Sequence, residues 1–509
     1  MLAKVRSSAV MGVDGFLVEV EVDIALGLPA FSIVGLAEAA VKESRERVKA
    51  AIKNCGYEFP PRRLTVNLAP ADVKKEGTGY DLPIALGVLA ATTDLDGDRL
   101  RRYAVIGELS LDGGVRLARG VLPMALAARE AGLTGILVPP DNAREAAVVA
   151  GIEVIPVATL HEACGFMNGT AELSPVTVDA AGIFLAGAEY PVDFEDVKGQ
   201  EHVKRALEIA AAGGHNVIMK GPPGSGKTML ARRLPTILPD LTFDEALDTT
   251  KIYSVAGLLP ADRPLLTTRP FRTPHHTISD AGLIGGGQTP RPGEVSLAHN
   301  GVLFLDELPE FKKHVLEVMR QPLEDGLVTI ARAASSLTFP ARFMLVAAMN
   351  PCPCGFRGDS LHPCTCTSLQ VQRYESRLSG PLLDRIDLHV EVPAVPFAEM
   401  TAERRGEPSA AIKARVDEAR ERQRQRFARR RSLHANSQMG PKEIKKHCAL
   451  DAEGQRLLAA AVERLGLSAR AFHRILKLAR TVADLDGAEA IAARHVAEAV
   501  QYRRLDRTH

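Results

Sequence analysis

The sequence predicts an α/β protein in which two α/β domains precede a helical lid. Three observations lead to this fold class. Residues 1–172 alternate between apolar strand patterns and helices, residues 195–395 do so around a glycine-rich loop, and residues 396–509 carry helical patterns almost throughout. At 509 residues the chain is too long for one hydrophobic core, because domains usually span roughly 100–200 residues.

Composition and charge narrow the class of protein further. With 46% apolar and 25% charged residues, every part of the chain can bury a core. Lys plus Arg (63) nearly equals Asp plus Glu (62), so any nucleic-acid surface must be a local patch. We expect a cytoplasmic protein, because the sequence has neither the apolar segment of a signal peptide nor a run of about 18 apolar residues.

The first domain begins with a clear strand pattern. Residues 16–24, FLVEVEVDI, alternate with period two, which turns one set of side chains inward: Phe16, Val18, Val20, Val22 and Ile24. We expect this strand to open the domain. The expected later elements are a helix at 37–54, a strand at 63–70, a helix at 81–91, a strand at 103–110, a helix at 121–132, a strand at 135–140, a short helix and a strand at 153–157. Residues 173–194 are predicted to be a linker.

The second domain contains a helix within 194–216 and the strand NVIMK, followed by the loop GPPGSGKT and another helix. The strands GVLFLDEL, FMLVAAMN and DLHVEVPAV come later. Strands that alternate with helices predict a parallel sheet covered on both faces. Beyond residue 396 the chain is Arg-rich and helical to 431, and the expected lid helices lie at 441–449, 451–465, 469–485 and 488–503.

The loop at 221–228 predicts binding of a nucleoside triphosphate. It follows an apolar strand and opens a helix, which is the context that this motif requires. Its backbone amides can surround the β-phosphate, Lys227 can reach the β- and γ-phosphates, and Thr228 can bind Mg²⁺. The candidate nucleotide-binding residues are Gly221, Pro222, Pro223, Gly224, Ser225, Gly226, Lys227, Thr228 and Met229.

Polar residues at the ends of later strands extend this prediction to hydrolysis. Asp306 is suited to hold Mg²⁺ together with Thr228, and Glu307 can polarise the attacking water. Asn350 ends the next strand, where it can position that water. Taken alone, the acid pair is also compatible with a solvated turn.

Three arginines are candidates for contact with phosphate. Arg385 lies on a loop before a strand and can reach the nucleotide of a neighbouring subunit, although a salt bridge to Asp384 or Asp387 is the alternative. Arg470 begins a lid helix and can fold over the nucleotide. Arg474, one turn later, competes for that role.

Four cysteines lie within residues 352–366: Cys352, Cys354, Cys364 and Cys366. Four thiolates match a closed tetrahedral Zn²⁺ site, with His362 as a possible substitute ligand. Reduced free thiols and a disulfide remain the alternatives. We expect the other cysteines, Cys55, Cys164 and Cys448, to be buried.

Two polar segments have more than one interpretation. Residues 413–431 carry nine basic and three acidic side chains on one expected helix, which favours a solvated helix face, with phosphate contact through Arg429, Arg430 and Arg431 as the alternative. His275 and His276 have no carboxylate or thiol nearby at ligand spacing. We interpret both as polar loop residues.

These motifs, together with DVKGQEHVKRALEIAAAGGHN, FRTPHHTIS and NPCPCG, resemble the magnesium-chelatase-like AAA+ family called YifB, or ComM after its competence-linked members. The resemblance covers residues 1–503. It implies a homo-hexameric ATPase of the helix-2-insert class, related to the magnesium chelatase ATPase subunit and to MCM helicases. For ComM it implies a DNA helicase that promotes branch migration during natural transformation.

The resemblance also assigns roles along the chain. Arg385 matches the arginine-finger position and Arg470 the sensor-2 position. Residues 250–300 would form the helix-2 insert and residues 327–343 the pre-sensor-1 hairpin, both directed towards the central pore. They are the candidate DNA contacts, above all Arg332.

The first domain resembles the Lon protease domain and the similar domain of RadA, with two departures. Residues 76–81, EGTGYD, replace the segment that carries the Lon serine, and Pro123 replaces the Lon lysine. A Ser–Lys dyad needs both groups, so we expect no proteolysis.

Three functional alternatives remain beside the DNA motor. The first is a chelatase-type ATPase that drives metal insertion into a tetrapyrrole, which the Lon-like first domain disfavours because the chelatase subunit is expected to lack it. The second is an ATP-dependent remodeller with a protein partner. The third is a scaffold that uses ATP only for assembly, which the presence of Glu307 disfavours.

Overall fold

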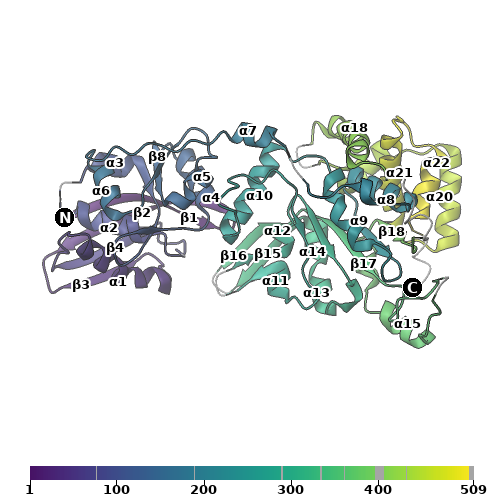
Figure 1. Cartoon of the computed structure of the whole chain (residues 1–509), viewed down its shortest axis with the longest axis horizontal. Helices are drawn as coiled ribbons and strands as arrows, with labels where there is room; N and C mark the ends of the chain where they lie inside the picture. Colours follow the sequence, from purple (N-terminus) through teal and green to yellow (C-terminus); the bar gives the residue numbers. More distant parts are fainter. Residues whose placement is uncertain are drawn as a thin grey trace.

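The computed structural model describes residues 1–75, 77–93, 95–187, 190–287, 290–332, 335–359, 362–395, 406–430 and 433–503, without the side chains of residues 39, 40, 332 and 335. Its longest axis runs from an N-terminal region, through a central region that carries the glycine-rich loop, to a group of C-terminal helices (Figure 1). The mixed α/β architecture and the helical C-terminal part predicted from the sequence are confirmed.

The N-terminal region contains a seven-stranded mixed sheet in the order β3-β4-β2-β1-β5-β8-β9. Its strands are β1 (Leu2–Met11), β2 (Asp14–Ala25), β3 (Ala30–Val34), β4 (Arg63–Ala69), β5 (Tyr103–Val105), β8 (Gly135–Val138) and β9 (Glu153–Pro156). A small hairpin, β6 (Glu108–Leu109) and β7 (Val115–Arg116), lies beside the sheet. The helices of this region are α1 (Ala39–Asn54), α2 (Asp81–Ala90), α3 (Gly97–Arg102), α4 (Val121–Glu130), α5 (Pro140–Ala146) and α6 (Leu160–Met167).

The alternation in β2 is confirmed, since Val18, Val20, Val22 and Ile24 are buried and Phe16 is half-buried. The expectation that this strand opens the fold is wrong, because β1 precedes it. β1 lies in the middle of the sheet, between β2 and β5, and buries two serines. Ser7 is accommodated because its hydroxyl donates to the Val105 carbonyl at 2.9 Å. Buried polar residues of this kind conceal a strand from a hydrophobicity pattern.

Two other boundaries differ from the sequence prediction. The expected strand at 103–110 divides into β5 and β6, with Gly107 between them. A Cβ at Gly107 would lie 2.6 Å from the side chain of Val115, so the chain turns where another residue would not fit. The expected linker 173–194 contains a short helix, α7 (Ala180–Leu185).

The central region contains a five-stranded sheet in the order β11-β14-β17-β10-β18, and every neighbouring pair is parallel. The strands are β10 (Val217–Lys220), β11 (Phe271–Arg272), β14 (Val302–Leu305), β17 (Met344–Met349) and β18 (Leu388–Glu391). The associated helices are α8 (Glu201–Gly213), α9 (Lys227–Arg233), α13 (Lys313–Val318), α14 (Arg320–Asp325), α15 (Ser368–Glu375) and α16 (Gly380–Leu383).

Helices cover both faces of this sheet, as the sequence predicts. Within β10, Val217 and Met219 pack into the hydrophobic cluster that contains α8. Ile218 points to the other face and packs into the cluster that contains α13. A strand that is covered on both sides is apolar at every position, which explains its continuous hydrophobic sequence.

The segment expected to form the helix-2 insert, 250–300, begins inside α10 (Phe243–Ala256) and includes β11, the edge strand of the central sheet. A two-residue strand is too short to show a pattern in the sequence. Beyond β11, the chain forms α11 (Asp280–Ile284), a hairpin of β12 (Gly285–Gly286) and β13 (Arg291–Pro292), and α12 (Glu294–Leu297).

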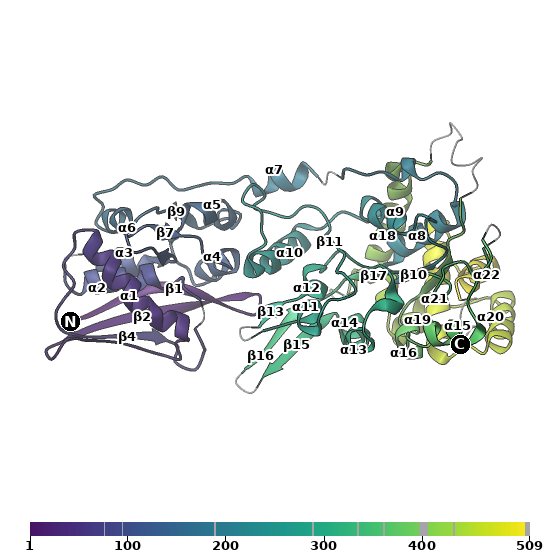
Figure 2. The same cartoon turned by 60° about the horizontal axis from the view of Figure 1, so that its bottom comes forward.

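The expected hairpin at 327–343 is confirmed as β15 (Leu327–Arg332) paired antiparallel with β16 (Ser335–Pro340). Figure 2 shows it extending away from the central sheet. It meets the β12–β13 hairpin, because a Cβ at Gly285 would lie 3.0 Å from Ile330 Cδ1. It also meets the turn between β1 and β2, where a Cβ at Gly12 would lie 3.3 Å from the Thr338 carbonyl oxygen.

Helix α10 joins the central and N-terminal regions. Leu241, just before this helix, and Ala246, within it, share a buried hydrophobic cluster with Leu122 of α4. The Gly120 amide donates to the Ser254 carbonyl at 3.1 Å, and the Ser254 hydroxyl donates to Glu145. Burying a leucine side chain contributes roughly 1.5–3 kcal/mol, so this shared core stabilises the contact between the two regions.

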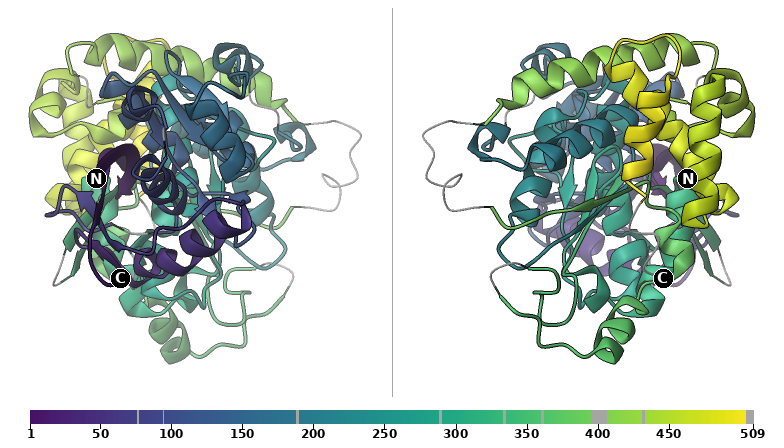
Figure 3. Two further views of the ribbon diagram at one scale, coloured as in Figure 1. Left: turned by 90° about the vertical axis from the view of Figure 1, so that its left-hand side faces the viewer. Right: turned by 90° about the vertical axis from the view of Figure 1, so that its right-hand side faces the viewer.

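The C-terminal helices are α18 (Ser409–Phe427), α19 (Pro441–His447), α20 (Ala452–Leu465), α21 (Ala469–Leu485) and α22 (Ala493–Gln501). Figure 3 shows the light-green α18 beside the yellow C-terminal helices, and its buried face contacts α8 and α21. The last helix begins at 493 and not at the expected 488, because the carbonyls of Ala488 and Glu489 accept hydrogen bonds from buried Arg480. Among the described residues, no helix combines the length and the apolar character needed to cross a membrane.

Candidate functional site

The glycine-rich loop leaves β10 at Lys220 and turns into α9 at Lys227. Gly224 and Gly226 have φ values of 75° and 85°, in the left-handed region that favours glycine. A Cβ at Gly221 would lie 2.0 Å from the Val392 carbonyl oxygen. The loop therefore needs glycine at these positions, and it presents the backbone cradle that phosphate groups require.

Lys227 ends this loop and is the first residue of α9. Its ammonium group donates to the carbonyls of Gly221 and Pro222 at 2.8 and 2.7 Å and to Asn350 Oδ1 at 3.3 Å. Burial lowers the pKa of Lys227, while the neighbouring Asp306 acts in the opposite direction. The structure thus brings together the P-loop lysine and the polar residue at the end of β17, which the sequence places 123 residues apart.

Thr228 and Asp306 also meet in this place. The threonine hydroxyl donates to Asp306 Oδ2 at 2.7 Å. Asp306 directly follows β14, so its carboxylate and the loop occupy the carboxyl edge of the parallel sheet. A hydroxyl beside a carboxylate is an oxygen donor set that suits Mg²⁺ together with nucleotide phosphates, so these residues fit the ion.

Glu307 has a strained backbone for a residue other than glycine, with φ 53° and ψ 47°. Its amide donates to Asp306 Oδ1 at 2.9 Å, and its side chain is 57% exposed. The Glu307 carboxylate is therefore accessible to water. Strain of this kind is common at functional sites, where a side chain must be aimed in one direction.

His276 lies against Glu307, with 3.7 Å between Nδ1 and Oε2. His276 is a polar loop residue as predicted, but a carboxylate does lie beside it, because Glu307 is close in space although distant in sequence. His275 does fit that interpretation, since its Nδ1 contacts the Thr277 hydroxyl at 2.9 Å. In the sequence, the adjacent His275 and His276 after β11 were the only indication that a histidine could lie at the nucleotide site.

The sequence analysis did not identify Gln200, whose side chain donates a hydrogen bond to the glycine-rich loop. Its backbone is left-handed at φ 56°, and its side-chain amide donates to the carbonyls of Ser225 and Pro393, both at 2.9 Å. Gln200 is buried, so these bonds tie the glycine-rich loop to the chain beyond β18. Its position just before α8, in the segment KGQEH, was the available signal.

Arg385 does not form the salt bridge to Asp384 or Asp387 that was the alternative to a role in phosphate contact. Its guanidinium pairs with Glu324 of α14 at 2.5 Å and donates to the Pro381 carbonyl at 2.6 Å. Arg385 is buried, and its Nε has no hydrogen-bond partner among the described residues.

Arg470 and Arg474 have different surroundings at the start of α21. Arg470 is exposed, whereas the Arg474 guanidinium is paired with Asp387. Burial alone would raise the pKa of Asp387, but Arg474 and His215 hold it below its ordinary range. Arg474 is therefore committed to a buried ion pair, and Arg470 is the one of the two that is free to approach a ligand.

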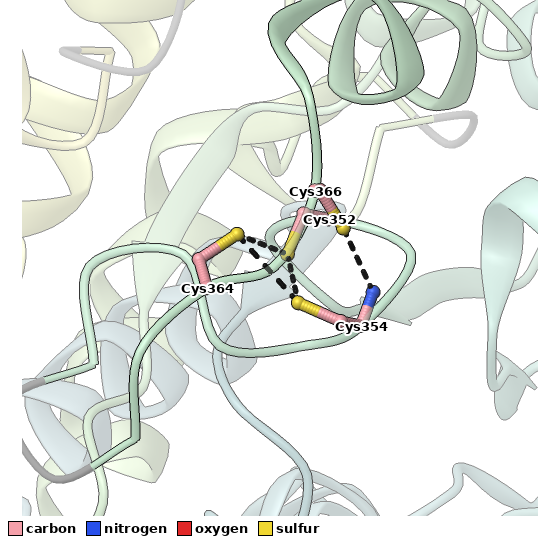
Figure 4. Close-up of side chains that lie close together, drawn as sticks. All are labelled: Cys352, Cys354, Cys364 and Cys366. Carbon is pink, nitrogen blue, oxygen red and sulfur yellow. Dashed lines mark hydrogen bonds between the residues drawn. The ribbon is translucent and has the colours of Figure 1, made fainter.

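The four clustered cysteines come together just beyond Asn350, and their sulfur atoms all lie within 4.8 Å of one another (Figure 4). All four are free cysteines, which excludes the disulfide alternative in this structure. His362 is absent from the group, and its ring pairs with Asp359 at 3.7 Å. Of the remaining cysteines, Cys164 and Cys448 are buried as expected, whereas Cys55 is half-buried.

Comparison with known proteins assigns the family. Residues 193–400 match the model described as magnesium chelatase, subunit ChlI, residues 20–142 match subunit ChlI of Mg-chelatase, and residues 406–503 match the ChlI C-terminal model. The chain is 45% identical to the YifB protein of Salmonella typhimurium over 99% of this chain and 98% of that protein. Identity and coverage are the same for the competence protein ComM of Haemophilus influenzae.

The chain belongs to the YifB/ComM family. This places it among the magnesium-chelatase-like AAA+ proteins, as the sequence motifs predict. The magnesium-chelatase 38 kDa subunit of Rhodobacter capsulatus is more distant, at 26% identity over 60% of this chain and 84% of that subunit. Because a chelatase model matches residues 20–142, the N-terminal region carries no argument against a chelatase-type function.

In this YifB/ComM member, one face of the basic helix α18 packs against the protein, and the opposite face, with Arg422 and Arg424, is exposed, as the predicted solvated face requires. Arg415 pairs with Glu208 and Glu407, and Arg420 donates to the Ala211 carbonyl. Arg426 is bound to buried Asp484. These charges fasten the helix to the central region and to α21. Arg430 pairs with Glu443 at 3.2 Å, and Arg431 lies outside the described residues.

The β12–β13 and β15–β16 hairpins carry the remaining residues of this YifB/ComM member that are candidates for contact with DNA. Arg332 is the last residue of β15, and its side chain lies outside the described part of the chain. Arg291 begins β13 and is exposed. The hairpins touch one another through Gly285 and Ile330.

Proposed function

We propose that this chain is an ATP-driven ring motor that acts on DNA, as a helicase that promotes branch migration during natural transformation or recombination. The observation that carries the proposal is the convergence of Lys227, Thr228, Asp306 and Asn350 at one edge of the parallel sheet, in a region that also carries two hairpins. This arrangement supports a machine that couples nucleotide hydrolysis to movement of a surface. We retain the domain division predicted above, with the Lon-like part, the ATPase core and the lid as its units.

ATP hydrolysis is assigned to the residues of this edge. Lys227 holds the β- and γ-phosphates, and Thr228 and Asp306 hold Mg²⁺, which supplies charge neutralisation for the phosphates. Glu307 accepts a proton from the attacking water, and Asn350 orients that water. The exposed carboxylate of Glu307, beside His276 at 3.7 Å, supports this role.

The proposal of a ring rests on Arg385, which the family resemblance places at the arginine-finger position. An arginine supplied by a neighbouring subunit stabilises charge in the transition state and increases the rate by ~10³–10⁵. We assign this role to Arg385 and the contact from the lid to Arg470, within a homo-hexamer. The exposure of Arg470 supports its assignment.

DNA contact is assigned to the surface of the two hairpins, with Arg291 and Arg332 as the contacting residues. Replacing both with Ala reduces the slope of log affinity against log salt by about 0.9 for each lost phosphate contact. Lys446→Ala, which removes an exposed charge from α19, is the matched control and leaves the slope unchanged. An unchanged slope in the double variant contradicts this assignment.

The choice of DNA as substrate rests on the relative named competence protein ComM, which matches over nearly its whole length. We also propose that the protein acts in the cytoplasm. The test is strand displacement and branch migration by the purified chain, together with its ATPase rate on forked and Holliday-junction DNA at low salt. We expect a several-fold increase in ATPase with DNA and loss of all activities in Lys227→Ala, with Lys446→Ala as control.

A chelatase-type ATPase that drives metal insertion is the second candidate, favoured by the chelatase family models and by the Rhodobacter capsulatus relative. An ATPase rate that does not respond to DNA at low salt, with hydrolysis intact, would favour this candidate or a remodeller with a protein partner. Against it, the similarity to the chelatase subunit covers 60% of the chain, whereas that to ComM covers 99%.

A further inference from the structure

The loop between β17 and α15 brings four thiols to one point. Cys352 and Cys354 leave the end of β17, and Cys364 and Cys366 return just before α15. The Cys352 sulfur lies 3.4 Å from that of Cys354 and 3.7 Å from that of Cys364. The sulfurs of Cys354 and Cys364 are 3.6 Å apart (Figure 4).

These distances match one kind of thiol site. With a Zn–S bond of about 2.3 Å, the sulfurs of a tetrahedral zinc site lie about 3.8 Å apart. A disulfide requires about 2.05 Å between sulfurs, well below every measured pair. The four sulfurs therefore have the spacing of metal ligands, and the metal-ligand group formed by the described residues contains only thiols.

Backbone amides surround the cluster. The Cys354 amide donates to the Cys366 sulfur at 3.3 Å, and the amides of Phe356 and Thr365 contact the Cys354 sulfur. Amide donors of this kind stabilise metal-bound thiolates and hold them in place. Cys352 is fully buried, so the cluster has an inner ligand that is shielded from solvent.

We propose that Cys352, Cys354, Cys364 and Cys366 bind one structural Zn²⁺, which clamps this loop against the nucleotide site. Binding releases the thiol protons to solvent and involves no change in oxidation state. The zinc site stands on its own geometry, while the effect on nucleotide binding rests on the proposed function.

Two contacts connect the loop with the P-loop. Gly355 packs on Pro223 so closely that a Cβ at Gly355 would lie 2.6 Å from the proline Cδ. Arg357 pairs with Glu375 at 3.7 Å, and Glu375 pairs with Lys220 at 3.0 Å. Lys220 is the last residue of β10, directly before the P-loop.

The cluster also begins two residues beyond Asn350, so a fixed cysteine loop restrains the end of β17. A metal at this point holds the P-loop and Asn350 in one arrangement. Without the metal, a long loop with little regular structure is left to hold that arrangement, and ordering it has an entropic cost. Loss of zinc is therefore expected to weaken nucleotide binding.

The test is metal analysis of the full chain, purified with reductant and without chelator. We expect about one Zn per chain in the wild type and in Cys55→Ser, a control outside the cluster. The double variant Cys354→Ser, Cys366→Ser should contain under about 0.2 Zn per chain. Cobalt loaded in place of zinc should give the absorption of a tetrahedral thiolate site in the wild type and in Cys55→Ser, and not in the double variant. A wild type that contains under about 0.2 Zn after incubation with Zn²⁺ overturns the proposal.

The clamp is tested separately through ATP binding. Stripping the metal should weaken ATP affinity about tenfold, and Zn²⁺ should restore it, because misplacing a binding group has costs of this size or more. Glu375→Gln should keep its zinc and show part of the same loss. Unchanged ATP affinity in metal-free protein overturns the clamp, whereas a chain that binds zinc but never hydrolyses ATP contradicts the proposed function and leaves the metal site intact.

Discussion

Arg385 and Glu324 form an ion pair within one chain, with 2.5 Å between the guanidinium Nη2 and the carboxylate Oε1. Glu324 lies on α14, next to the β15–β16 hairpin, and is 50% exposed. To reach a neighbouring nucleotide, Arg385 must exchange this carboxylate for phosphate. The ion pair thus connects the proposed arginine finger with α14, the helix that directly precedes the β15–β16 hairpin.

A mixing experiment tests whether Arg385 acts between subunits. Arg385→Ala alone should lower the ATPase rate by ~10³–10⁵, and Lys227→Ala should abolish it. Mixed rings of the two variants contain some interfaces with both residues intact, so activity should partly return. If Arg385 acts within its own chain, mixtures stay inactive. Arg377→Ala, which removes an exposed pair with Glu310, serves as control.

Glu307→Gln is expected to lower the rate of ATP hydrolysis by about 10²–10⁴ while ATP binding is retained, because the amide cannot accept the proton of water. Steady-state ATPase and binding of a fluorescent ATP analogue measure the two effects. Glu310→Gln, three residues away and also exposed, is the matched control. Equal losses in both variants would mean that charge in this segment matters and not the proposed base.

His276 is expected to act as a positioning residue for Glu307. His276→Ala should lower the hydrolysis rate by roughly tenfold, less than Glu307→Gln, because the contact at 3.7 Å is lost. His275→Ala, whose ring contacts Thr277 instead, should leave the rate unchanged. Equal losses in the two histidine variants would contradict a specific role of His276 beside Glu307.

Stability should fall in acid through His299. Burial lowers the pKa of His299 to about 4 from an ordinary value of 6.5, and its Nδ1 accepts the Arg342 amide at 3.0 Å. Between these pKa values the unfolded chain binds more protons than the folded chain, so stability is full above about 6.5 and declines as pH falls towards about 4. The maximum slope is about 1.4 kcal/mol per pH unit.

Unfolding temperatures of wild type and His299→Asn at pH 7.5 and 5.5 check this dependence. Asparagine retains an acceptor near the position of Nδ1 and cannot be protonated, so the loss on acidification should be smaller in the variant. An equal loss in both proteins would assign the acid sensitivity to other buried groups. His389 is one of these, because burial lowers its pKa to about 3.

Much of the fold could be predicted from local sequence, because turns, helices and alternating strands depend on interactions between residues that are close in the chain. The P-loop could be placed from its glycines and from the apolar strand before it, and β2 from its alternation. β1 could not, because its buried Ser7 and Ser8 depend on neighbours across the sheet. The edge strand β11 escaped notice because two residues carry no period.

The site divides in the same way. Lys227, Thr228, Asp306, Glu307 and Asn350 follow strands of one parallel sheet, and parallel strands end at the same edge, so their proximity was predictable. The partner of Arg385 was not, since α14 and the loop before β18 meet only through packing. The same holds for His276 beside Glu307, where two loops far apart in sequence come together.

The sequence by itself determined which chemical groups this protein possesses: a phosphate-binding loop, an acid pair, an arginine before a strand and four clustered thiols. These depend on residue type and short spacing. The tertiary structure decided which charged side chains are paired within the chain, because a buried charge without a partner has a high free-energy cost. It therefore committed Arg474 to Asp387 and Arg426 to Asp484, and left Arg470, Arg291 and Glu307 exposed.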